Sequence, residues 1–185
     1  MLFSKNKLLK FQIFSVIFTW ILGTLLHFTY EWSNENIIIA AFSAVNESTW
    51  EHLKLLFFPM FITTVIGYFY LRPTEEYKNF LCAKTIGILS ALSFVVVFFY
   101  TYTGIIGTNF AVLDIGSFFV GVLLGEFVAY KLMKNNVKCN RWLAVIVLLV
   151  LLLCFVIFTY HTPHIGLFRN PVSGIYGISW YIQDK

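Results

Sequence analysis

The sequence predicts an all-α fold, a polytopic membrane bundle of five transmembrane helices, and two properties of the chain lead to this prediction. The first is composition, because 59% of the 185 residues are hydrophobic and only 12% are charged, which is typical of chains that cross a bilayer repeatedly. The second is the length of the apolar runs, since five of them approach the roughly 20 residues that a spanning helix needs. We place the transmembrane helices at 9–31, 49–71, 79–103, 109–133 and 141–160, in a single integral membrane domain covering residues 1–185.

The distribution of basic residues predicts the orientation. If the N-terminus lies in the cytoplasm and the five helices alternate, ten of the 13 Lys and Arg residues fall on the inner side. This asymmetry is what the positive-inside rule describes. We therefore expect the N-terminus inside and the C-terminus outside.

The first two helices flank the most elaborate connection in the chain. The first apolar run is too long for a signal peptide and lacks a small-x-small cleavage site, so we keep it as a helix. The segment 36–45 is apolar but too short to span, which favours a short re-entrant or interfacial helix between helices 1 and 2. Ser48 and Glu51 then match a Ser-x-x-Glu capping box at the start of the second helix.

The later helices have simpler boundaries. Gly104 and Gly107 mark a short outer turn, and Gly121 and Gly125 form a small-xxx-small pair suited to close helix packing. Residues 162–185 are broken repeatedly by proline and glycine yet carry apolar side chains, which predicts a strap over the outer helix ends.

The three cysteines give no disulfide framework. Cys82, Cys139 and Cys154 fall on the inner side or in mid-membrane under this topology. We expect inert, buried thiols.

Polar side chains gather at the outer ends of the helices. All four histidines and six of the nine acidic residues fall there. His27 and Glu31 are one helical turn apart, as are Ser48 and His52. Imidazole and carboxylate at one membrane depth are the ligands that Zn²⁺ prefers, and ionisable groups inside a membrane are expensive unless they have a function.

We therefore predict a site for Zn²⁺ or another divalent metal. The candidate ligands are His27, Glu31, His52 and His164, the candidate catalytic carboxylates are Glu51 and Asp114, and the further polar site residues are Glu47, Lys54 and Arg169. No soluble zinc motif is present, so a structural interpretation stays open beside this one. In it, capping explains Glu51 and the helix dipole explains Glu47. Asp114 then needs a buried partner such as His27, Lys54 or Arg169. Deeper in the membrane, Glu126 can pair with Lys84.

Three runs in the sequence resemble a known family. They are HFTYEW from His27, VNESTWEHLK from Val45, and PHIGLFRNP from Pro163 with a following Tyr176-Gly177. Together they resemble a family of small polytopic bacterial membrane proteins of unknown function. The resemblance covers nearly the whole chain and implies a multi-pass protein of the bacterial inner membrane, with no activity attached. A looser similarity in residue type and depth is to seven-helix membrane hydrolases that hold zinc near one membrane face.

Three functions remain open from the sequence. The first is a metal-assisted hydrolase acting on a lipid or lipid-linked substrate. The second is a small transporter or binding protein for a cation or proton. The third is an accessory membrane subunit without chemistry, which would dock through the Gly121 and Gly125 face. The expected partners are the lipid bilayer and a lipid-type substrate, with no nucleic acid; whether the protein is an enzyme and its oligomeric state stay open.

Overall fold

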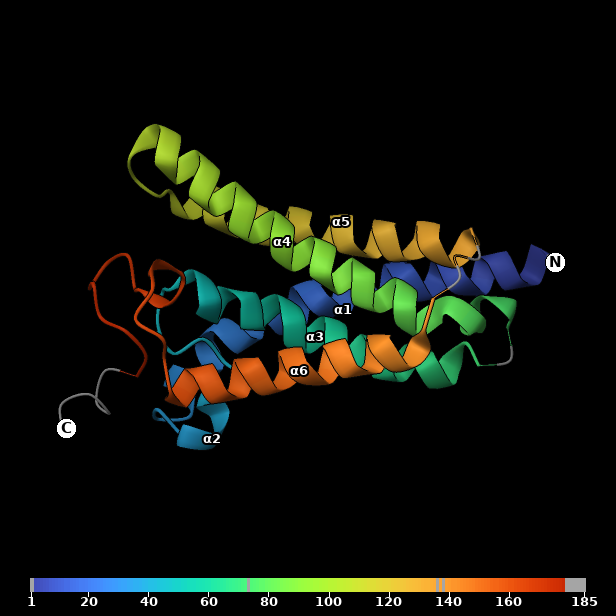
Figure 1. Cartoon of the computed structure of the whole chain (residues 1–185), viewed down its shortest axis with the longest axis horizontal. Helices are drawn as coiled ribbons and strands as arrows, with labels where there is room; N and C mark the ends of the chain where they lie inside the picture. The colour runs from blue at the N-terminus through green and yellow to red at the C-terminus, as the bar shows by residue number, and fades with distance from the viewer. Residues whose placement is uncertain (1, 73, 136, 138, 179–185) are drawn as a thin grey trace.

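The computed structural model describes residues 2–72, 74–135, 137 and 139–178. The described chain is all-helical, and five of its helices are long and apolar enough to cross a membrane, which confirms the predicted fold class. They run as an antiparallel bundle (Figure 1). Their bounds are α1 (Leu2–Trp32), α3 (Thr49–Tyr70), α4 (Phe80–Ile106), α5 (Ala111–Lys134) and α6 (Arg141–Tyr160). Three short elements complete the order: α2 (Ile37–Ala40) and the 3₁₀ helices η1 (Glu75–Asn79) and η2 (Gly166–Phe168).

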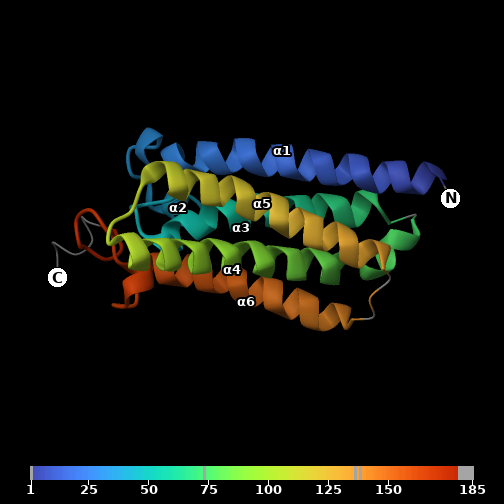
Figure 2. The same cartoon turned by 90° about the horizontal axis from the view of Figure 1, so that it is seen from above.

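Helix α3 lies at the centre of the bundle, with the other long helices around it (Figure 2). In its most apolar stretch 61% of the residues are buried inside the protein, against 22% in α6. Its buried side chains, among them Leu56, Phe57 and Met60, pack against α4, α5 and α6. The apolar surface of the outer helices is left for lipid, because in a membrane it needs no protein cover.

The glycines of α5 are used inside the bundle. A Cβ atom added at Gly125 would lie 2.6 Å from the carbonyl oxygen of Gly87 in α4, and one at Gly121 would lie 3.0 Å from Val95. Glycine lets the two helix backbones approach this closely. The Gly121 and Gly125 face is therefore covered by α4, and the expectation that it is a free docking surface is wrong.

A buried ion pair joins α4 and α5 in the half of the bundle that contains the N-terminus (Figure 1). Lys84 donates to Glu126 over 2.5 Å, and the two side chains are 0% and 2% exposed. Ser15 of α1 donates to the same carboxylate oxygen over 2.7 Å. This contact confirms the pairing of Glu126 with Lys84 that the sequence suggested, and it gives each of the two buried charges a partner.

The cysteine prediction needs correction. Cys82 in the first turn of α4 and Cys139 before α6 are joined by a disulfide, with their Cα atoms 6.3 Å apart. The α5–α6 connection returns over the start of α4, and this tertiary contact brings together two residues 57 positions apart. Only Cys154 has a free thiol.

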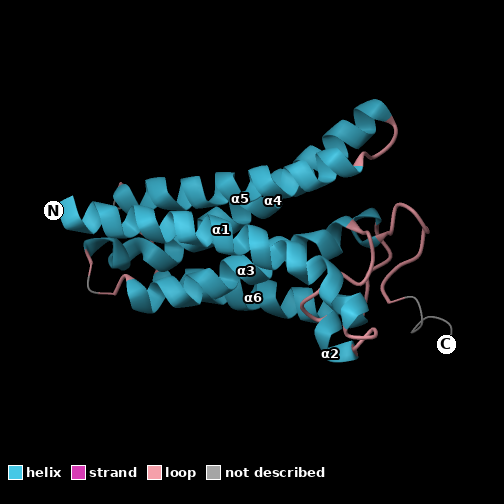
Figure 3. Cartoon of the chain, turned by 180° about the vertical axis from the view of Figure 1, so that it is seen from behind, coloured by secondary structure: helices cyan, strands magenta, loops and turns pink. Residues whose placement is uncertain are grey.

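The end of the bundle opposite the N-terminus carries α2 and the C-terminal segment (Figure 1). Residues 162–178, the described part of the predicted strap, lie over these helix ends, while 179–185 lie outside the described residues (Figure 3). Phe168 of the strap stacks on Trp50 with ring centroids 4.7 Å apart. The side-chain amide of Asn46 donates to the carbonyl oxygen of Gly177 over 2.9 Å. At this same end the α4–α5 hairpin diverges from α1, α3 and α6 (Figures 1 and 3).

Candidate metal centre

The site is built where the chain enters α3. Ser48 caps the helix, because its Oγ accepts a hydrogen bond from the backbone N–H of Glu51. Asn46 Oδ1 in turn accepts from the backbone N–H of Ser48 over 2.8 Å. These contacts fix the backbone around Glu47, which lies between the two residues and outside the helix. The backbone that leads into α3 is therefore fixed by contacts within the protein itself, without a bound ligand.

Three side chains converge at this entry. One ligand atom each from His27, Glu47 and His52 lies within 4.8 Å of the others. His52 Nε2 is 3.4 Å from Glu47 Oε2, and the two imidazole rings are 5.4 Å apart between centroids. In the described part of the chain this is the one group of three or more His, Cys, Asp or Glu side chains close enough to hold a metal ion.

Hydrogen bonds orient the histidines for ligation. His52 Nδ1 lies 3.0 Å from the carbonyl oxygen of Ser48, so it carries the proton and donates. Nε2 faces Glu47 Oε2, to which it donates while it is protonated, and a bound metal would take the place of that proton. Metal-binding histidines commonly donate their second N–H to a backbone carbonyl in this way. In His27, Nδ1 is buried and has no hydrogen-bond partner in the described structure, which is unusual for a buried polar atom unless a ligand satisfies it.

Glu47 is exposed and electrostatically matched to the histidines. Hydrogen bonding from His52 is the main cause that lowers the pKa of the Glu47 carboxyl, partial burial opposes it, and the charges of His52 and His27 lower it further. The carboxylate is therefore ionised near neutral pH, as ligation of a divalent cation requires.

Two histidines and one carboxylate fit a zinc ion with an open position. Catalytic zinc sites use three protein ligands, His₂Glu among them, and leave the fourth position to water. Bond lengths near 2 Å imply ligand atoms roughly 3.4 Å apart in a tetrahedral site. The 4.8 Å limit here is wider, so small side-chain rotations would close the three ligands on an ion.

The three side chains lie on the wall of a cavity of about 540 Å³. This cavity separates the α4–α5 hairpin from α1 and α3, and Pro171 and Val172 of the strap also line it. Its wall is mostly apolar, with Phe28, Leu55, Leu56, Val95, Phe99, Ile115, Phe118 and Phe119. The other polar lining residues are Thr24, Thr49, Asn109, Asp114 and Ser117.

Comparison with known sequences places the chain in a family. The sequence model of a family of unknown function, DUF6512, matches residues 1–178. The chain belongs to DUF6512. No curated protein and no solved structure gives a significant match. Membership of DUF6512 agrees with the expected kind of family and brings no activity with it, so function must be argued from the site.

In this DUF6512 chain Asp114 faces the same cavity as the three converging side chains. Its carboxylate accepts hydrogen bonds from the hydroxyl of Tyr102 and from the side-chain amide of Asn109, the latter over 3.1 Å. The expected partners were His27, Lys54 or Arg169. The partners are instead two neutral donors, Tyr102 near the end of α4 and Asn109 in the turn that follows it.

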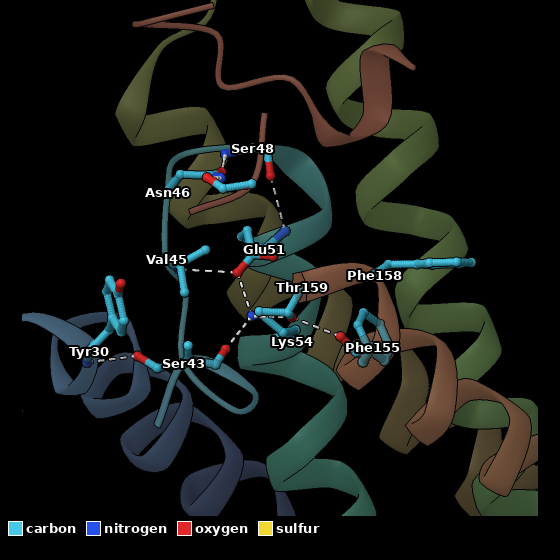
Figure 4. Close-up of polar contacts among 12 residues, drawn as sticks. Tyr30, Ser43, Val45, Asn46, Ser48, Glu51, Lys54, Phe155, Phe158 and Thr159 are labelled. Atoms are coloured by element: carbon cyan, nitrogen blue, oxygen red, sulfur yellow. Dashed lines mark hydrogen bonds and ion pairs between the residues drawn. The ribbon is translucent and has the colours of Figure 1, made fainter. Parts of the chain in front are cut away.

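Glu51 and Lys54 form a separate buried pair (Figure 4). Their side chains are 4% and 0% exposed, and Lys54 Nζ is 2.5 Å from Glu51 Oε2. Glu51 also accepts from the backbone N–H of Val45, and Lys54 donates to Ala40 and Thr159. The capping box is thus half formed, because the Glu51 carboxylate turns to Val45 and Lys54 instead of Ser48. Neither side chain lines the cavity.

The remaining predicted site residues lie apart from the converging group. Glu31 is exposed at the end of α1 and reaches His27 only through electrostatics. His164 packs on Tyr176 of the strap, with ring centroids 4.7 Å apart. The Arg169 side chain lies beside Gly174 within the same strap. Of the four predicted metal ligands, the structure brings together His27 and His52 and adds Glu47.

Proposed function

We propose that this DUF6512 protein binds Zn²⁺ or a similar divalent metal through His27, Glu47 and His52 and hydrolyses a lipid or lipid-linked substrate. The observation that carries the proposal is the position of these ligands, at one place on the wall of a largely apolar cavity between membrane helices. In the predicted orientation the site lies on the extracytoplasmic side of the bacterial inner membrane.

The cavity supports an amphiphilic substrate. A polar headgroup can contact the metal ligands and Asp114, while aliphatic chains contact the aromatic and aliphatic wall. The hairpin of α4 and α5 diverges from the rest of the bundle at this end, so substrate would enter sideways from the lipid (Figure 3). Phe28 and Ile115, both on this cavity and both exposed, lie along such a route.

The protein residues have distinct roles in this proposal. A bound metal would supply a hydroxide nucleophile by lowering the pKa of its coordinated water. Of the described residues that line the cavity, Glu47 and Asp114 are the acids. Since Glu47 is needed as a ligand, Asp114 is the candidate proton acceptor, and Tyr102 and Asn109 hold its carboxylate in place. Glu51 keeps a structural role with Lys54.

Metal analysis of the purified protein tests the proposal. We expect about one zinc per chain in the wild type, and loss of stoichiometric metal in a His27→Ala/His52→Ala variant. His164→Ala removes an imidazole from the same end of the bundle but outside the group, so its metal content should match the wild type. A chelator should abolish hydrolysis of a phospholipid reporter, and Asp114→Asn should lower the rate while keeping the metal. A metal-free wild type would overturn the metal assignment.

A specific observation also supports the cation or proton transporter. Thr19, Gln12 and Glu126 each carry a buried side-chain oxygen without a hydrogen-bond partner in the described structure, close to the Lys84 pair. Such atoms are commonly satisfied by internal water. The residues that line the outer cavity include Leu56, Val95 and Phe119 but not Thr19, Gln12 or Glu126. A closed floor favours the hydrolase, and substrate-dependent flux in proteoliposomes without product formation would favour the transporter.

A further inference from the structure

A second cavity lies at the opposite end of the bundle from the metal centre. Its volume is about 390 Å³, and it forms where the end of α3, η1, the start of α4 and the α5–α6 connection meet. It is lined by Tyr68, Tyr77, Lys78, Leu81, Asn140 and Arg141, together with Cys139. The disulfide from Cys139 to Cys82 ties the connection to α4 and so fixes this wall.

Positive charge collects around this cavity. Lys78 and Arg141 line it, and Arg72 and Arg141 both lie within electrostatic range of the Tyr77 hydroxyl. Lys78 pairs with Glu75 over 2.6 Å, but the two side chains are 70% and 82% exposed, so this pair is weak. Among the described side chains, neither arginine forms an ion pair with a carboxylate. Among the described side chains, three cations therefore lie at or near the cavity, and one of them, Lys78, has a carboxylate partner.

The remaining polar groups supply hydrogen-bond donors. Tyr68 and Tyr77 pack with ring centroids 5.0 Å apart, and both line the cavity. Asn140 uses its carbonyl oxygen to cap α6 by accepting from Trp142 and Leu143, which leaves its NH₂ group as a donor. A guanidinium matches the oxygens of a phosphate with two parallel hydrogen bonds. This set of groups suits an anionic phosphate.

Apolar surface adjoins the cavity on α6. Trp142, Leu143 and Ile146 are 69%, 59% and 56% exposed, and they follow Arg141 directly along the helix. At a membrane surface, indole rings mark the headgroup level and aliphatic side chains contact the acyl chains. A charged headgroup at the cavity and hydrocarbon along α6 are therefore adjacent, as they are in one phospholipid molecule.

We propose that this cavity binds the headgroup phosphate of an anionic phospholipid in the leaflet opposite the metal centre. Basic pockets between transmembrane helices bind anionic headgroups by the same chemistry. The site is independent of the proposed hydrolase, since it shares no residue with the outer cavity.

Native mass spectrometry of the purified protein, titrated with phosphatidylglycerol and with phosphatidylcholine, tests this site. We expect tighter binding of phosphatidylglycerol, weakened about fivefold by Arg141→Gln and about fivefold by Lys78→Gln, the two cations that line the cavity. A fivefold change corresponds to roughly 1 kcal/mol per basic residue in contact with an anionic headgroup. Lys134→Gln is the matched control. It removes one exposed cation at the same end of the bundle that lies over Tyr130 and outside the cavity, so it should leave binding unchanged.

Three results would overturn the proposal. The two lipids could bind equally, or Lys134→Gln could weaken binding as much as Arg141→Gln, which would mean general attraction to positive charge. Inorganic phosphate alone could also stabilise the delipidated protein against heat as much as phosphatidylglycerol does, which would assign the cavity to a soluble phosphate group. Because every substituted side chain is exposed, loss of folding does not confound the comparison.

Discussion

Replacement of Lys54 by methionine should destabilise the protein far more than the same replacement at Lys78. Both lysines pair with a glutamate three residues earlier, at 2.5 Å and 2.6 Å. The Lys54 pair is 0% and 4% exposed, whereas the Lys78 pair is 70% and 82% exposed. The chain thus offers two pairs of equal spacing and order that differ in burial.

The magnitude follows from burial. Removing Lys54 leaves the Glu51 carboxylate buried without a counter-ion, which costs about 3–5 kcal/mol, and the hydrogen bonds to Ala40 and Thr159 are lost as well. An exposed pair contributes about 0–1 kcal/mol. We therefore expect Lys54→Met to lower the free energy of unfolding by at least about 2 kcal/mol more than Lys78→Met does.

Unfolding in mixed micelles, followed by circular dichroism over an increasing fraction of denaturing detergent, measures this difference. The double variant Lys54→Met/Glu51→Gln should recover part of the loss, because it removes the stranded charge and keeps an oxygen for the backbone N–H of Val45. If Lys54→Met costs no more than Lys78→Met, or if the double variant is less stable than Lys54→Met alone, the reasoning from burial is wrong.

Three further predictions concern other parts of the molecule. Because His52 lowers the pKa of the Glu47 carboxyl below its ordinary 4.5, the ionised Glu47 stabilises the fold above pH 4.5, and this stabilisation is lost as the pH falls through the lowered pKa. Glu47→Gln should therefore flatten this part of the curve of stability against pH. An unchanged curve would contradict the contact between His52 and Glu47. Gly87→Leu should separate α4 from α5, because even a Cβ atom at Gly87 would lie 2.5 Å from the carbonyl oxygen of Gly125. We expect this variant to unfold at a lower temperature in detergent than the wild type. Gly104→Leu is the control, since a Cβ atom at Gly104 meets no atom within 4 Å. If the N-terminus is cytoplasmic, a membrane-impermeant maleimide should label Cys139 in inverted vesicles after reduction and leave it unlabelled in intact cells; labelling of cells would reverse the orientation.

The helices were predictable because their signal is local. Long apolar runs must become helices in a bilayer, where each backbone polar group needs a partner within its own segment. His27 and His52 could also be placed together, since both lie near the outer end of a helix and topology sets membrane depth. Depth alone does not give the rotation of a helix, so the pairing of the two rings required the structure.

The rest of the site depended on non-helical backbone. The sequence placed Glu47 among the further polar residues and not among the metal ligands. It precedes α3, which begins at Thr49, and its carboxylate lies beside His52. His164 belongs to the strap and lies outside any helix, so no periodic pattern in the sequence predicts which way its side chain faces. The contact between Tyr102 and Asp114 could have been predicted from the sequence. The two residues lie on either side of the short α4–α5 turn, and a helical hairpin brings such positions together.

The Lys84 and Glu126 pair constrains how the protein enters the membrane. A lysine costs up to about 2.5–3.5 kcal/mol at the centre of an inserted helix and less toward its ends. Lys84 is close to the start of α4, so α4 carries part of this cost until α5 supplies Glu126. Since α4 and α5 are consecutive and their glycines already fit together, insertion of the two as one hairpin meets both demands at once. A nascent chain that stops after α4 would leave the Lys84 ammonium without the carboxylate that pairs with it in the complete bundle.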